Sequence, residues 1–124
     1  MAYSSEQKQV ILVVEDETLI RLNAADMIRD MGFEVVEAAD ADQAISLLES
    51  MPEITVVFTD IQMPGSMDGL RLVEMVRKRW PPVALLVTSG RFRPRADELP
   101  DNTHFLPKPY MLRELESHLH ALTH

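Results

Sequence analysis

The side chains of this sequence that could do chemistry follow short apolar runs. Two acids follow the run at residues 10–14, another acid follows the run at 54–58, two hydroxyls follow 83–87 and a lysine follows 104–106. In chain order they are Glu15, Asp16, Asp60, Thr88, Ser89 and Lys108. If the runs are parallel strands, their carboxyl ends meet at one edge of a sheet, where open α/β sheets bind ligands. We therefore expect these side chains to converge on one crevice.

Three carboxylates in one crevice require a cation. Carboxylates at such short distances repel one another, and the repulsion raises their pKa values unless a positive charge lies between them. The chain has no cysteine and no suitably placed histidine, so oxygen ligands favour Mg²⁺ or Mn²⁺ over zinc. A metal beside a lysine and a hydroxyl suits phosphoryl transfer. A carboxylate would be the nucleophile and would form an acyl phosphate.

The elements that position these residues alternate between strands and helices. Runs at residues 10–14, 54–58 and 83–87 indicate strands buried on both faces, while 33–37 indicates a strand nearer an edge and 104–106 a short last strand. Between the runs, apolar residues recur with a helical period. This alternation predicts βαβ units in a doubly wound parallel sheet.

Helix boundaries are indicated by capping and breaking residues. One helix should end at Gly32, the next should be capped by Asp40 with Gln43 reaching back, and a third should stop before Pro81. The last should present Leu112, Leu115, Leu119 and Leu122. Between residues 90 and 103, two prolines bracket few helix-compatible residues, so we expect a short helix at best, in a mobile segment.

Composition narrows the class of protein. The 124 residues suffice for one domain, which we expect to span 1–124 with its core at about 9–122. A net charge of −8 argues against direct binding to nucleic acid. The sequence has no apolar run long enough for a membrane span, no secretory signal pattern and no cysteine, so we expect no membrane partner and a cytoplasmic location.

In order and spacing, these residues resemble the receiver domains of two-component response regulators, from about residue 10 to residue 122. The motifs are Val14-Glu15-Asp16, Asp60-Ile61-Gln62-Met63-Pro64-Gly65 with Asp68-Gly69, Thr88-Ser89-Gly90 and Lys108-Pro109-Tyr110. Each motif alone is weak, but their joint order is specific. The resemblance implies a flavodoxin-like (βα)5 three-layer sandwich with sheet order 2-1-3-4-5.

The resemblance implies a phosphorylation and metal site. Asp60 would be the phosphoacceptor and would bind Mg²⁺ (or Mn²⁺) together with Asp16. Glu15 would hold metal-bound water, and the backbone carbonyl of Gln62 would complete the protein's share of the ligands. The chain would be a phosphoacceptor rather than an enzyme in the ordinary sense.

The resemblance also implies a switch. Lys108 would pair with the phosphoryl group, and Ser89 would donate a hydrogen bond to it, with Thr88 as the second choice. Phe105 matches the aromatic position of the switch, although an ordinary core role is the alternative. Pro109 matches a position that follows a cis peptide bond.

Three features depart from the family's pattern. The acidic pair is Glu15-Asp16 rather than two aspartates, Ser66 is an extra residue before Asp68, and the fourth helix is weak. Because the family usually signals through a face that includes that helix, its usual dimer is in question, and we expect a monomer or weak dimer.

The expected function is that of a stand-alone receiver, with a piece of a larger regulator as the alternative. A sensor histidine kinase or phosphotransfer protein would donate the phosphoryl group, and an unidentified downstream protein would receive the signal. Gln62 and Arg91 flank the phosphoryl position and would tune its lifetime. A pseudo-receiver with a vestigial pocket is a second hypothesis, against which Asp16, Asp60 and Lys108 argue. A flavin-binding protein of the same fold is a third, which the acidic first loop disfavours.

Overall fold

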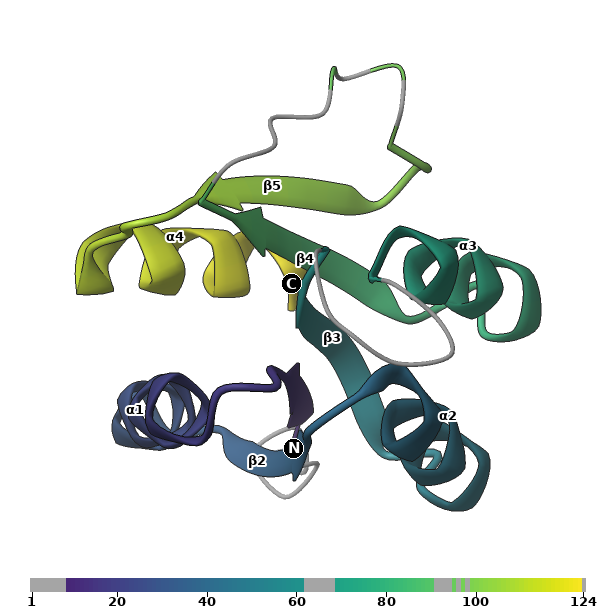
Figure 1. Ribbon diagram of the computed structural model, residues 1–124, viewed down its shortest axis with the longest axis horizontal. Helices are drawn as coiled ribbons and strands as arrows, with labels where there is room; N and C mark the ends of the chain where they lie inside the picture. The colour runs from purple at the N-terminus through teal and green to yellow at the C-terminus, as the bar shows by residue number, and fades with distance from the viewer. Residues whose placement is uncertain (1–8, 62–68, 91–94, 96, 98, 124) are drawn as a thin grey trace, which may run out of the picture.

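The computed structural model describes residues 9–61, 69–90, 95, 97 and 99–123 (Figure 1). Five parallel strands form one sheet in the order β2-β1-β3-β4-β5, which confirms the expected topology. They are β1 (Val10–Val14), β2 (Glu34–Ala38), β3 (Ile54–Asp60), β4 (Ala84–Ser89) and β5 (Thr103–Pro107). Every residue of β1 is buried, whereas the edge strand β2 is mostly half-buried, as the apolar patterns indicated.

Helices cover both faces of the sheet and make a three-layer sandwich. The described helices are α1 (Thr18–Asp30), α2 (Ala41–Ser50), α3 (Gly69–Arg79) and α4 (Leu112–Leu122). One apolar cluster joins α1 and α4 to the sheet, and a second cluster joins α2 and α3 to the opposite face (Figure 1). Because strand residues alternate between faces, each buried strand supplies side chains to both clusters.

The connection between β4 and β5 differs from a full (βα)5 repeat. Its described residues, 90, 95, 97 and 99–102, include no α-helix, and Asp97 lies in a single 3₁₀ turn. The expectation of a short helix at best agrees with these residues, while 91–94, 96 and 98 lie outside the described part of the chain. The described sandwich therefore has five strands and four helices.

The predicted helix signals lie where the sequence placed them. Asp40 Oδ1 accepts a hydrogen bond from the backbone N–H of Gln43 at 2.8 Å, which caps α2. The Gln43 side chain reaches back to the N–H of Ala39 at 2.8 Å, one residue before the cap. Gly32 follows α1 with φ of 100°, a left-handed conformation that favours glycine after a helix.

Two strands extend further than their apolar runs. The backbone ladder pairs Asp60 with Thr88 and Ser89 with Pro107, so these polar residues are the last residues of strands rather than the first of loops. Hydrogen bonding between backbones does not depend on side-chain polarity, and for this reason the apolar pattern stopped short. Asp60, Thr88 and Ser89 therefore belong to the sheet itself.

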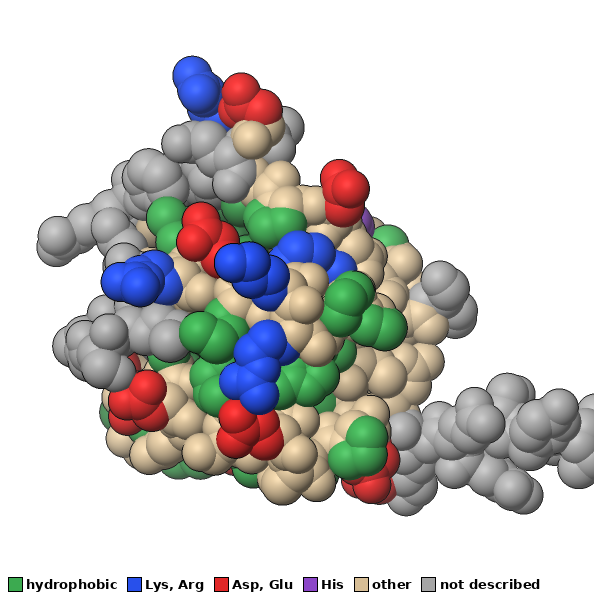
Figure 2. All heavy atoms as spheres, turned by 90° about the vertical axis from the view of Figure 1, so that its right-hand side faces the viewer, with side chains coloured by type: hydrophobic (Ala, Val, Ile, Leu, Met, Phe, Trp, Pro, Cys, Tyr) green, Lys and Arg blue, Asp and Glu red, His purple; other side chains and the backbone are tan. Residues whose placement is uncertain are grey.

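The negative net charge is not spread evenly over the surface. Figure 2 shows the α2 and α3 side of the molecule, where Lys and Arg side chains lie among hydrophobic ones. Helix α3 carries Arg71, Arg77, Lys78 and Arg79, and Arg79 bridges to Glu49 of α2 at 2.9 Å. Among the described helices, none is long and apolar enough to cross a membrane.

Candidate functional site

Lys108 joins two acidic side chains at the carboxyl edge of the sheet. Its Nζ donates to Oδ2 of Asp60 at 2.7 Å and to Oε1 of Glu15 at 3.2 Å. Glu15 follows β1, Asp60 ends β3 and Lys108 follows β5, so the predicted crevice brings three distant segments together. The side chains of Glu15, Asp60 and Lys108 are 7%, 11% and 22% exposed, which shields these charge-assisted hydrogen bonds from water.

The crevice is short of positive charge. Burial raises the pKa of Glu15 above its ordinary value of 4.5, although the N–H of Glu17 and the charge of Lys108 oppose the shift. Burial alone would lower the pKa of Lys108, but its hydrogen bond to Asp60 and the nearby carboxylate charges raise that pKa above 10.5. Among the described residues, one lysine therefore faces two carboxylates, and the crevice would accept a further cation.

Asp16 lies at the rim of this arrangement. It is exposed, and a hydrogen bond between its side chain and that of Glu15 contributes to the raised pKa of Glu15. Within residues 9–61, 69–90, 95, 97 and 99–123, no three Asp, Glu, His or Cys side chains are arranged to hold a metal ion. Gln62 lies outside the described residues. The structure thus brings Glu15 and Asp60 together and leaves Asp16 at the rim.

The two candidate hydroxyls lie on opposite faces of β4. Thr88 and Ser89 are both buried, and successive strand residues alternate between faces. The Cα atom of Thr88 is the register partner of Asp60, and within the described part of the chain the Thr88 hydroxyl has no hydrogen-bond partner. The backbone carbonyl of Ser89 accepts the N–H of Lys108 at 3.0 Å, so Ser89 fixes the backbone that carries the lysine.

Phe105 shares a face of the sheet with Ser89. It is the register partner of Val87, two residues before Ser89, and residues two apart on a strand point the same way. The Phe105 ring is half-buried and packs against the cluster that α2 and α3 cover. This placement is compatible with either a switch residue or an ordinary core residue.

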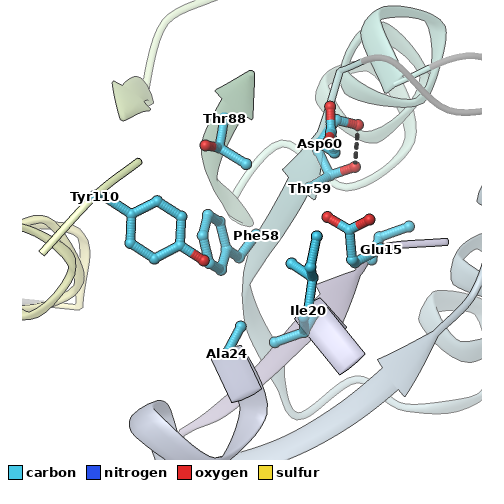
Figure 3. A pocket seen from close by; sticks show the side chains of 10 residues that line it. Glu15, Ile20, Ala24, Phe58, Thr59, Asp60, Thr88 and Tyr110 are labelled. Carbon is cyan, nitrogen blue, oxygen red and sulfur yellow. Dashed lines mark hydrogen bonds between the residues drawn. The ribbon is translucent and has the colours of Figure 1, made fainter. Parts of the chain in front are cut away.

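A small cavity lies beneath the acidic residues (Figure 3). Glu15, Asp60 and Thr88 line it together with Tyr110 and Phe58. The rings of Tyr110 and Phe58 meet edge to face with centroids 5.7 Å apart, and burial raises the pKa of Tyr110 above 10. The peptide bond between Lys108 and Pro109 is cis, as the resemblance implied.

Gly69 is a site residue whose role the sequence did not reveal. It begins α3, and a Cβ atom there would collide with the backbone of Asp60 and Ile61. Only a residue without a side chain lets the start of α3 approach the phosphoacceptor candidate this closely. Its place in the Asp68-Gly69 motif was the available signal, but the collision depends on tertiary contact.

The sequence is similar to a known protein family and to curated proteins. The family model for the response regulator receiver domain matches residues 11–120. Sensor kinase CckA of Brucella abortus is 34% identical over 109 residues, which are 85% of this chain and 11% of that protein. Transcriptional regulatory protein PdtaR of Mycobacterium tuberculosis is 33% identical over 109 residues, 85% of this chain and 52% of its own length. The chain thus spans about half or less of these curated relatives.

Solved structures agree with the sequence comparison. The receiver domain from hybrid histidine kinase CckA aligns with a TM-score of 0.79 at 32% identity, covering 93% of this chain and 99% of that one. Chemotaxis protein CheY4 of Vibrio cholerae aligns with a TM-score of 0.83 at 25% identity, covering 93% and 98%. Together with the match over residues 11–120 and the sheet order, these likenesses show that the chain belongs to the response regulator receiver domain family.

Proposed function

We propose that this receiver domain accepts a phosphoryl group on Asp60 in a metal-dependent reaction and signals its state through a partner protein. The observation that supports this most directly is the 2.7 Å contact between Lys108 Nζ and Asp60 Oδ2 in a largely buried crevice. A cation fixed at a carboxylate is placed to neutralise charge on a group transferred to that carboxylate. Glu15, on the other side of Lys108, supplies a second acidic group.

In the proposed step, a carboxylate oxygen of Asp60 attacks the phosphorus atom of a phosphohistidine on a histidine kinase or phosphotransfer protein. A P–O bond forms and the P–N bond breaks, while the departing imidazole keeps the electron pair of that bond and takes up a proton. Lys108 offsets part of the charge on the phosphoryl oxygens. Hydrolysis of the acyl phosphate returns free Asp60 and inorganic phosphate, at a rate that Gln62 and Arg91, both outside the described residues, would tune.

The donor set of the crevice suits Mg²⁺ or Mn²⁺. Glu15 and Asp60 present hard carboxylate oxygens, a single lysine balances them, and Asp16 adds a carboxylate at the rim. The carboxylates of Glu15, Asp16 and Asp60, with the backbone carbonyl of Gln62, would hold the ion. When bound, it would supply the positive charge that the phosphoryl oxygens need beyond that of Lys108.

The change of state would pass through the end of β4. A phosphoryl dianion on Asp60 would attract a hydroxyl at the end of β4, that of Ser89 in the family alignment with Thr88 as the second choice. Phe105 lies on the same face of the sheet as Ser89. Movement of Ser89 toward the phosphoryl group would alter the space available to the Phe105 ring. The two residues together would bias the β4–β5 surface between two states.

Exposed apolar side chains beside the crevice support a protein as phosphoryl donor. Leu19 on α1 is 81% exposed and Met111 before α4 is 68% exposed. A groove that includes Leu19, Ile20 and Pro109 reaches Lys108 itself. Apolar surface of this kind next to a reactive group marks a site for protein contact.

Intact mass after incubation with acetyl phosphate and Mg²⁺ tests the proposal on the wild type and on Asp60→Asn. Asp101→Asn serves as a matched control, because Asp101 is an exposed aspartate outside the crevice. The wild type and Asp101→Asn should each gain one phosphoryl group, and Asp60→Asn should gain none. Excess EDTA should suppress the gain in both reactive proteins.

Two outcomes would contradict the proposal in different ways. A phosphoryl gain on Asp60→Asn would place the acceptor on another residue. No gain in any protein, together with no Mg²⁺ binding by calorimetry, would point instead to a constitutive binding module with an inactive pocket.

A further inference from the structure

Two histidines outside the phosphoryl site meet between the edge strand β5 and helix α4. The Nδ1 atoms of His104 and His118 are 2.9 Å apart, and their ring centroids are 5.0 Å apart with an interplanar angle of 75°. A hydrogen bond between two Nδ1 atoms needs a proton on one and a lone pair on the other. The contact therefore requires at least one of the two rings to be neutral.

The pair is half-buried beside apolar side chains. His104 is the register partner of Leu86, and the cluster on this face of the sheet includes Leu106 and Leu119. Among the described residues, the titratable groups that act on the His118 ring are His104 on β5 and Glu114 one turn earlier on α4. On this face β4 presents Ala84 and Leu86. Of these described groups, only Glu114 would stabilise a positive charge on His118.

We propose that the His104–His118 pair is a pH-sensitive latch between β5 and α4. Near neutral pH the shared proton holds the helix against the edge strand. When both rings carry a proton, no acceptor remains between the Nδ1 atoms and two positive charges face each other. The rings then separate and the hold of β5 on α4 weakens. Neither histidine lines the cavity beside Asp60.

The direction of the pH effect follows from the environment of His118. Burial, and then the neighbouring His104, lower the pKa of His118 below its ordinary 6.5, and Glu114 offsets part of this shift. A histidine whose pKa is lower in the folded state binds its proton more tightly in the unfolded state. The latch therefore contributes its full stability above about pH 6.5 and loses it as the pH falls below that value.

Histidine ring titration by NMR between pH 5 and 8 tests the proposal in EDTA-containing buffer, since two imidazoles this close could also chelate a trace metal. Wild type, His104→Gln and the control His120→Gln are compared, His120 being an exposed histidine of the same helix. The His118 ring should titrate below 6.5 in the wild type and His120→Gln. In His104→Gln its pKa should move upward.

Amide hydrogen exchange at pH 7.5 and 5.5 supplies the second readout, as protection factors corrected for the intrinsic exchange rate. Protection in α4 should fall at pH 5.5 while protection in α2, on the opposite face of the sheet, stays unchanged. The equilibrium constant for opening of α4 should rise once both rings are protonated. The rise is about tenfold for each unit by which the pairing lowers the pKa of His118. A His118 titration identical in wild type and His104→Gln, or α4 protection indifferent to pH, would overturn the latch.

Discussion

Asp60 and Thr88 are register partners at the ends of β3 and β4, while Ser89, one residue later, lies on the opposite face of β4. Two buried hydroxyls thus lie at the end of the strand beside Asp60, on opposite faces of the sheet. Thr88 shares a strand face with Asp60, and Ser89 shares one with Phe105. Substitution can separate their roles, because Thr88→Val removes the hydroxyl of Thr88 with little change in the shape of the side chain.

Thr88→Val should raise the free energy of unfolding by about 1 kcal/mol, since a buried hydroxyl without a hydrogen-bond partner in the described structure is costly. If Ser89 is the hydroxyl that serves the phosphoryl group, Thr88→Val should keep the wild-type rate of phosphorylation by acetyl phosphate. Ser89→Ala should lower that rate or shorten the lifetime of the acyl phosphate. Urea denaturation and time-resolved intact mass measure the two effects, and the reverse pattern would assign the role to Thr88.

Lys108→Met should slow phosphorylation of Asp60 by about a hundredfold, the usual cost of removing one donor to a developing oxyanion. The substitution keeps much of the apolar stem and removes the charge that lies between Asp60 and Glu15. Lys108→Arg retains the positive charge on a side chain of different shape, and its phosphorylation rate should lie between those of the wild type and Lys108→Met. A melting temperature for each variant separates loss of chemistry from loss of folding. Wild-type rates in Lys108→Met would remove the lysine from the mechanism.

Gly69→Ala should destabilise the fold by about 1–3 kcal/mol, because the new Cβ would displace the backbone of Asp60 and Ile61. Phosphorylation should fall with it, since the same displacement moves Asp60, the proposed phosphoacceptor. Gly90→Ala is the matched control, as its nearest contact would be an ordinary 3.8 Å from Cβ of Lys108. Chemical denaturation of both variants checks this difference, and equal tolerance at the two glycines would contradict it.

Acidification from pH 7.5 to 5.5 should lower the melting temperature of the wild type more than that of the double variant His104→Gln and His118→Gln. The pKa of His118 is lower in the folded state, so the stabilising contribution is lost as the pH falls below about 6.5. Glutamine in both positions removes the titration but keeps polar side chains. Parallel pH profiles for the two proteins would show that the acid sensitivity arises elsewhere.

The sequence predicted the strands and their order because buried parallel strands are marked by continuous apolar runs. It also predicted the cap of α2 at Asp40, since that cap is a local hydrogen bond to Gln43. The ends of β3 and β4 were placed too early, because the ladder continues through Asp60 and Ser89 without any apolar side chain to signal it.

For the site too, some features could be predicted from the sequence and others depend on tertiary packing. Convergence of Glu15, Asp60 and Lys108 followed from strand order alone. Two contacts could not be predicted from the sequence: the close approach of Gly69 to the backbone of Asp60, for which the Asp68-Gly69 motif was the one signal, and the meeting of His104 with His118. Both depend on how a helix packs against a strand. The roles assigned to Asp16, Gln62, Ser89 and Phe105 stay predictions, and Ser89→Ala tests that of Ser89.

Because Lys108 contacts both Asp60 and Glu15, reactivity toward acetyl phosphate should report whether the whole sheet has folded. The lysine's partners Asp60 and Glu15 lie 48 and 93 positions earlier in the chain, and β5 follows the other four strands of this sheet in sequence. An amino-terminal fragment that stops before β5 contains both acids but lacks the cation between them. The fraction of chains that acetyl phosphate can modify should therefore follow the fraction in which the whole sheet has assembled.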